Sequence, residues 1–328
     1  MRITAKTICA SAAGLAGLAA GAALLRAGPG SPMLRAAKTI MKLRGTAAWE
    51  TLDLDVAALR KGSENNAKLM KPDKSVAFEP LLLGGVDAEI ARPPKYREDA
   101  IVLYIHGGGF ISGSYRHVRA FTAYFALRSE MKVCCADYRL APEHPYPAAP
   151  DDCFAAYRAL TETFPEKKIF LLGESAGANL VLVTALRAKD EGLKLPAGVI
   201  AYAPVADMTG AVDRSPYAKT EIIISALATT AVQRLYCPQG ELADPYVSPF
   251  YGDYGGFPPL RLVWDGGEAL CPDGAMLAEK ARAAGVDIEA KQWEGTFHAF
   301  ALAGKALPES RREIADSIAF IRRRAAAS

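Results

Sequence analysis

The stretch LLGESAGANL, residues 171–180, sets one serine between two glycines where an apolar run gives way to a helix-like segment. A serine at a tight strand-to-helix turn adopts a strained backbone geometry that exposes its hydroxyl. Gly173 and Gly177 fit such a turn because a side chain at either position would collide with the neighbouring strand and helix. The pattern marks Ser175 as a candidate nucleophile, although G-x-S-x-G also occurs in ordinary turns.

Outward from Ser175, short apolar runs alternate with segments of helical periodicity. The expected strands are 101–105, 132–136, 168–172, 199–202, 260–264 and 288–292, and the expected helices are 117–129, 148–161, 176–188, 272–284 and 309–324. This alternation is typical of a mostly parallel sheet that helices cover on both faces. The sequence therefore predicts an α/β fold, and no Ser/Gly or Pro linker divides it into independent domains.

Two regions depart from the alternation. Residues 30–75 are helical and basic in character, and residues 206–246 form a long insertion after the expected strand 199–202. Segments this long in a compact domain are usually lids or binding elements. We therefore expect both regions to serve the site rather than the sheet.

Acyl transfer needs a nucleophile, a base, an acid that orients the base, and donors for the developing oxyanion. Residues 106–109 read HGGG after the expected strand 101–105, and their backbone N–H groups can crowd against a carbonyl oxygen. The N–H of Ala176, at a helix start, adds a further donor. A phosphate loop would carry Lys or Ser/Thr after the glycines, where this chain has Phe110 and Ile111.

The base is expected to be His298, one of four histidines. It lies in GTFHAF on a loop after the expected strand 288–292, where a side chain projects over the sheet edge. The order serine, acid, histidine is that of α/β-hydrolases, which puts the acid near the end of strand 260–264. Asp265, Glu268 and Asp273 are the candidates there.

Six motifs together carry a closer resemblance. They are HGGGF (106–110), DYRLAPEHPYPAAPDD (137–152), GESAG (173–177), DPYVSPFYGD (244–253), GGFPPLRLVWDGGEALCPD (255–273) and GTFHAF (295–300). From about residue 80 onward, some three quarters of the chain, the sequence resembles the hormone-sensitive-lipase-like (bacterial family IV) carboxylesterases of the α/β-hydrolase superfamily, with these signatures in the family's order.

The resemblance implies a fold, a reaction and a set of roles. It implies an α/β-hydrolase fold with a helical cap formed by about 30–75 and 206–246. The oxyanion hole would be Gly108, Gly109 and Ala176, and Glu268 would be the acid because it stands two residues before a leucine. Asp265 stays an alternative, since the family more often has Val-Gly before the acid.

The reaction implied is hydrolysis of a small-molecule carboxylic ester with short to medium acyl chains, through an acyl-enzyme and without cofactor or metal. Cleavage of acetyl groups from amides is an alternative on the same scaffold. A non-catalytic receptor that binds a small ligand in the same pocket is the rival from another class, which the presence of Ser175, His298 and an acid in register disfavours.

Charge and cysteine content bear on the partners and metal sites that the protein could have. The net charge of +3, without basic clusters interleaved with aromatics, argues against nucleic acid as a partner. Six cysteines show no zinc-type spacing, and Cys134 and Cys135 are expected to be core residues. The sequence leaves the oligomeric state open, with a homodimer as one option.

The first 28 residues bear on whether the protein attaches to a membrane and in which cellular compartment it works. Seven basic residues and no acidic one lie within 1–49, and 7–25 is an uncharged stretch rich in Ala and Gly. Such a stretch suits a signal or membrane anchor in length, but is poor in Leu, Ile and Phe. Two alternatives follow for 1–28: an exported or membrane-associated enzyme, or an N-terminal helix of a cytoplasmic one.

Overall fold

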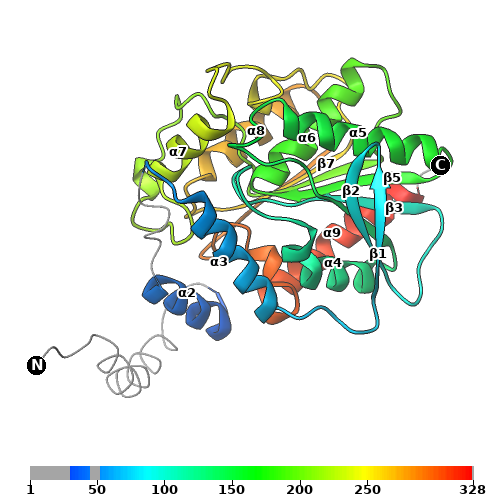
Figure 1. The fold of residues 1–328 in the computed structure, drawn as a ribbon, viewed down its shortest axis with the longest axis horizontal. Coiled ribbons are helices and arrows are strands. Elements are labelled where there is room, and N and C mark those ends of the chain that lie inside the picture. Colours follow the sequence, from blue (N-terminus) through cyan, green and yellow to red (C-terminus); the bar gives the residue numbers. More distant parts are fainter. Residues whose placement is uncertain (1–29, 45–51, 327–328) are drawn as a thin grey trace, which may run out of the picture.

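One mixed sheet runs through the computed structural model, which describes residues 30–44 and 52–326 (Figure 1). In the described residues it has eight strands in the order β1-β2-β4-β3-β5-β6-β7-β8. Their bounds are β1 Ala77–Leu83, β2 Val86–Arg92, β3 Ala100–Ile105, β4 Lys132–Ala136, β5 Lys168–Glu174, β6 Gly198–Tyr202, β7 Leu260–Asp265 and β8 Ile288–Trp293. From β4 to β8 all neighbours are parallel, which confirms the predicted α/β class.

Helices cover both faces of this sheet. The helices of the described residues are α2 Pro32–Arg44, α3 Val56–Leu69, α4 Tyr115–Ser129, α5 Ala148–Thr163, α6 Ala176–Asp190, α7 Ala226–Tyr236, α8 Cys271–Ala283 and α9 Pro308–Ala326, with short 3₁₀ helices η2 Ser215–Tyr217, η3 Pro249–Tyr251 and η4 Phe300–Ala306. In Figure 1, α5, α6 and α8 lie above the sheet and α4 and α9 below it. Each expected strand and helix overlaps an observed one.

Alternation along the strands explains the two layers. On β3, Leu103 and Ile105 belong to the core cluster under α5, α6 and α8, whereas Val102 and Tyr104 belong to the cluster under α4 and α9. Successive side chains of a strand point to opposite faces, so a strand buried on both sides is apolar throughout. Cys134 and Cys135 of β4 are divided between the clusters in the same way and are buried, as expected.

The β1–β2 hairpin is an element that the sequence analysis missed. The two strands pair antiparallel, and β2 in turn pairs antiparallel with β4. Gly84 and Gly85 form the turn with φ values of 59° and 89°, a conformation that suits the twist of a two-residue hairpin. The signal was present as Gly-Gly between the apolar stretch 80–83 and the alternating segment 86–92.

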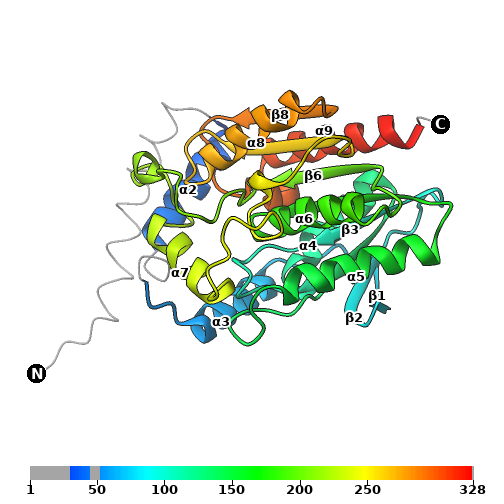
Figure 2. The same cartoon turned by 90° about the horizontal axis from the view of Figure 1, so that it is seen from above.

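Both regions outside the alternation contain helices among their described residues, and most of the insertion 206–246 is irregular chain. Residues 30–75 contain α2 and α3, and the insertion contains η2 and α7. Figures 1 and 2 place α2, α3 and α7 at the same end of the molecule, opposite the C-terminus. The expected signal, anchor or helix at 1–28 lies outside the described residues. Within those residues, no helix combines the length and apolar character needed to cross a bilayer.

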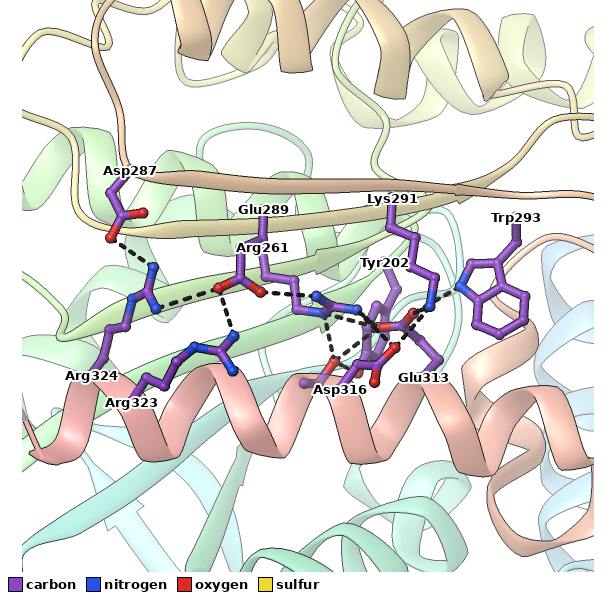
Figure 3. Close-up of polar contacts among 11 residues, drawn as sticks. Tyr202, Arg261, Asp287, Glu289, Lys291, Trp293, Glu313, Asp316, Arg323 and Arg324 are labelled. Carbon is purple, nitrogen blue, oxygen red and sulfur yellow. Dashed lines mark hydrogen bonds and ion pairs between the residues drawn. The ribbon is translucent and has the colours of Figure 1, made fainter.

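A cluster of charged side chains fastens α9 to the last two strands (Figure 3). Arg261 of β7 and Glu313 of α9 are buried and 2.6 Å apart. The other Glu313 oxygen accepts from Trp293 Nε1 at 2.8 Å, and Lys291 of β8 pairs with Asp316 at 2.7 Å. Removing one partner of a buried ion pair costs about 3–5 kcal/mol. The cluster therefore fixes the strands that lead into the acid and histidine loops.

Candidate active site

Ser175 occupies the turn between β5 and α6. It has φ 55° and ψ −121°, a backbone conformation that is unusual for a residue with a side chain. The surroundings hold this strain in place, since the Ser175 N–H donates to the Tyr202 carbonyl of β6 at 2.8 Å. The serine hydroxyl is therefore presented at the carboxyl end of the sheet.

The two glycines of the motif are required by close packing. A Cβ on Gly173 would lie 2.4 Å from the carbonyl oxygen of Gly177. A Cβ on Gly177 would lie 2.1 Å from the carbonyl oxygen of Ile105 on β3. Both distances are far inside van der Waals contact, so the predicted collision with helix and strand is confirmed.

The structure brings Ser175, His298 and Glu268 into one hydrogen-bonded chain. His298 Nε2 lies 2.9 Å from Ser175 Oγ, and His298 Nδ1 lies 2.6 Å from Glu268 Oε2. Glu268 follows β7 and His298 follows β8, so the two side chains come from the ends of neighbouring strands. Glu268 Oε1 also accepts the Asp265 N–H at 2.9 Å, which fixes the plane of the carboxylate.

The charges around His298 determine the pKa of its imidazole ring. Burial lowers the histidine pKa, but the hydrogen bond and charge of Glu268, together with the charges of Glu221 and Glu174, outweigh burial, so the His298 pKa lies above the ordinary 6.5. The carboxylate thus favours the imidazolium form that arises when the ring accepts the serine proton. An imidazole placed between a hydroxyl and a carboxylate is the arrangement used for general-base activation of a nucleophile.

The other two candidate acids make different contacts. Asp265 Oδ2 accepts both the N–H and the hydroxyl of Thr296 at 2.7 Å, and thereby joins the acid loop to the histidine loop. Asp273 forms a buried ion pair with Arg214 at 2.7 Å. It also accepts the N–H of Asp207 at 3.0 Å, at the start of the insertion. Neither carboxylate hydrogen-bonds to His298.

The glycine loop follows β3 and faces the serine. Gly108 and Gly109 have φ values of 118° and 63° and line the cavity next to Ser175. A Cβ on Gly108 would lie 2.2 Å from the Ser112 carbonyl oxygen, so only glycine fits there. Ala176 is buried at the first position of α6, where a backbone N–H has no partner within its own helix. These groups are the expected oxyanion donors.

A cavity of about 230 Å³ opens in front of Ser175 and His298. Its wall is mostly apolar, and nearly half of its lining residues come from the insertion 206–246. The large apolar side chains in the wall are those of Phe110, Met208, Ile223, Ile224, Val232, Leu270 and Leu302. No described residue of 30–75 belongs to this lining.

Two residues at the site escaped the sequence analysis. Glu174, the variable residue before the serine, is buried, and burial raises the pKa of its carboxyl to about 7. It accepts the Gly107 N–H at 2.7 Å and the Tyr104 hydroxyl, and so ties the glycine loop to the serine turn. Arg214 lines the cavity from the insertion. A charged residue in an apolar run was the only signal for Glu174.

Known proteins share this architecture. The model of a family described as "alpha/beta hydrolase fold" matches residues 102–302. An esterase of Acinetobacter venetianus is 33% identical over 82% of this chain and 89% of its own length. An acetyl-hydrolase of Streptomyces hygroscopicus is 30% identical over 89% of this chain and 97% of its own.

The chain belongs to the α/β-hydrolase fold family. A solved structure of a hormone-sensitive lipase from a metagenome library superimposes with a TM-score of 0.84 at 33% identity, covering 89% of this chain and 98% of the other. The expected hormone-sensitive-lipase-like carboxylesterase is thereby confirmed, and the chain is a serine ester hydrolase rather than a non-catalytic receptor.

Proposed function

We propose that this hydrolase cleaves esters through an acyl-enzyme on Ser175, with His298 as base and Glu268 as the acid that orients it. The observation that carries the proposal is the unbroken chain of contacts from Ser175 Oγ to Glu268, at 2.9 and 2.6 Å. As the serine oxygen bonds to the ester carbonyl carbon, its proton passes to His298 Nε2. The histidine returns that proton to the departing alcohol oxygen.

The oxyanion that forms in each step is assigned to the N–H groups of Gly108, Gly109 and Ala176. Preorganised donors of this kind stabilise charge that develops only in the transition state, worth about 3–4 kcal/mol each in comparable enzymes. In the second half, water attacks the acyl carbon while His298 takes a water proton. Ser175 is then regenerated and the carboxylic acid is released.

The substrate class is proposed to be esters of short to medium acyl chains. A mostly apolar cavity of about 230 Å³ suits a small aliphatic acyl group and offers few partners for a charged one. The name acetyl-hydrolase of the Streptomyces relative is in keeping with a small acyl group. Acetyl amides are the alternative substrate on the same scaffold.

The cap is proposed to combine two segments with different tasks. The insertion 206–246 would form the wall of the acyl pocket, to which it contributes α7. The region 30–75 would support the glycine loop from behind: Arg60 of α3 donates to the Ile111 carbonyl at 2.8 Å and pairs with Glu143 at 2.6 Å.

An assay across p-nitrophenyl esters from acetate to palmitate tests the proposal, with the matching p-nitroanilides as the amide series. We expect the highest kcat/KM for acyl chains of a few carbons, with esters well above amides. Activity confined to the anilides would favour the deacetylase alternative. No hydrolysis of any member would contradict the proposed substrate class.

Attachment to a membrane through 1–28 and assembly into a homodimer are further proposals that rest on sequence alone. Basic residues near an anionic leaflet contribute about 1 kcal/mol each, and the first 49 residues carry seven of them without an acid. Sedimentation of the full-length enzyme with membranes, and release on deletion of 1–28, would support an anchor. Full-length protein wholly in the soluble fraction would favour the N-terminal helix. Light scattering measures the oligomeric state.

A further inference from the structure

Glu221 of the insertion has a carboxylate whose two oxygens face different segments. Oε1 accepts the N–H groups of the next three residues, Ile222, Ile223 and Ile224, at 2.7, 2.6 and 3.1 Å. Oε2 accepts the N–H of Ala269 at 2.8 Å. Ala269 directly follows the proposed acid, Glu268. One side chain therefore links the insertion to the acid loop.

The arrangement requires a carboxylate. Ionised Glu is an acceptor only, and its four hydrogen-bond partners here are all backbone N–H donors. Hydrogen bonds to an ionised acceptor are roughly twice as strong as neutral ones. Glutamine at position 221 would present an NH₂ group to N–H donors at one of the two ends, so one set of contacts would be lost.

Neighbouring contacts show that the two segments run alongside each other. A Cβ placed on Gly267 would meet the Thr220 Cβ at 3.4 Å. Cys271, two residues beyond Ala269, lies near enough to the Tyr217 hydroxyl to raise the pKa of that hydroxyl. The segment 217–224 thus lies beside the acid loop, and Glu221 provides a hydrogen bond between them.

The residues that Glu221 holds include part of the cavity wall, since Ile223 and Ile224 both line the cavity. We propose that Glu221 is a positioning residue that fixes this wall to the loop of Glu268, so that acyl-chain selectivity and the alignment of the acid depend on the same carboxylate. The inference rests on the proposed function, because it assigns Glu268 to the triad and the cavity to the acyl chain.

The charge of Glu221 gives a second readout. Burial lowers the pKa of His298, whereas the carboxylates of Glu268, Glu221 and Glu174 raise it. The charge of Glu221 also acts on Lys38 of α2, whose pKa is lowered by burial while Asp265 and Glu221 raise it. Removing the negative charge at position 221 therefore lowers the pKa of His298, and the acid limb of kcat/KM moves to lower pH.

The test compares wild type, Glu221→Gln and Glu221→Asp, with Glu241→Gln as matched control. Glu241 is an exposed glutamate of the same insertion outside the cavity lining. The readouts are the ratio of kcat/KM for p-nitrophenyl hexanoate and acetate, and the pH profile on acetate. A merely structural role would lower the melting temperature or the active fraction, neither of which changes a ratio of two substrates.

We expect Glu221→Gln to change the hexanoate-to-acetate ratio by roughly tenfold, in the range that one or two methylenes control in a pocket, and to move the acid limb downward. Glu241→Gln should change neither. A folded Glu221→Gln enzyme with the wild-type ratio and limb overturns the inference while leaving the proposed function intact. A wild type without esterase activity refutes both.

If Glu221→Gln does not fold, Glu221→Asp decides the question. Aspartate keeps the charge but is one methylene shorter, so it reaches the N–H groups of its own segment and loses Ala269. We then expect an altered substrate ratio with an unchanged acid limb. A wild-type ratio in the folded aspartate variant overturns the inference.

Discussion

The serine turn and the insertion 206–246 face the same cavity but are built in opposite ways. At the turn, Ser175 is held at positive φ, and a Cβ on Gly177 would lie 2.1 Å from a backbone oxygen. The insertion presents apolar side chains such as Val232, held through polar anchors that include the Arg214–Asp273 ion pair. The turn therefore tolerates almost no change, whereas the wall can change shape and alter selectivity without loss of chemistry.

The largest effect is expected at the turn itself. Ser175→Ala removes the nucleophile from a backbone that close packing already fixes, so folding should be retained. We expect kcat to fall by roughly 10⁴-fold or more, as for nucleophile removal in other serine hydrolases. Steady-state kinetics with circular dichroism as the folding control measure this. Substantial turnover by the folded variant would contradict the role of Ser175.

The next effect separates the candidate acids. Glu268→Gln should lower kcat by roughly 10⁴-fold, because an amide no longer stabilises the imidazolium or holds its tautomer. Asp265→Asn and Asp273→Asn are the matched controls and should lose far less, since neither side chain hydrogen-bonds to His298. Wild-type activity in Glu268→Gln, together with loss in Asp265→Asn, would transfer the role to Asp265.

The pH dependence follows from His298. The histidine must be neutral to accept the serine proton, and Glu268 raises its pKa above 6.5 against the effect of burial. Activity should therefore be full above that raised pKa, and kcat/KM should fall about tenfold per pH unit below it. The midpoint should lie on the alkaline side of free histidine. A flat profile between about pH 5 and 8 would contradict this assignment.

The smallest effect is expected in the wall. Val232 of α7 lines the cavity, so Val232→Phe should shorten the pocket and lower kcat/KM for hexanoate roughly tenfold relative to acetate. Leu227→Phe is the control on the same helix, at an exposed position outside the lining. If both variants, or neither, change the ratio of the two substrates, α7 is not the wall that selects the acyl chain.

The same contrast explains what the sequence predicted. The serine turn can be predicted from the sequence because its steric requirements involve few residues. Gly173, Ser175 and Gly177 are required by contacts within one strand, one helix and the adjacent strand. His298 was found because it follows a recognisable strand, on a loop at the sheet edge. The resemblance to a known family favoured Glu268 over Asp265 and Asp273 but kept Asp265 as an alternative, and the hydrogen bond between Glu268 and His298 became visible only in the structure.

The contacts that could not be predicted from the sequence join residues far apart in the chain. Glu221 meets Ala269 across 48 positions, and Arg214 meets Asp273 across 59. Neither pair has a spacing rule, because the insertion reaches the acid loop through tertiary packing. The β1–β2 hairpin was missed for another reason, since both of its strands are short and carry charged residues, a pattern that fits several local structures. The candidate catalytic residues were therefore easier to predict from the sequence than the contacts that shape the cavity wall.

Covalent labelling tests the central claim most directly, namely that Ser175 is the residue that receives the acyl group. Wild type and Ser175→Ala are treated with an organophosphate reagent, and the modified peptide is mapped by mass spectrometry. We expect one stoichiometric adduct on Ser175, loss of activity in proportion to labelling, and no adduct on the folded variant. An adduct on another serine of an inactivated enzyme, with Ser175 unmodified, would contradict it.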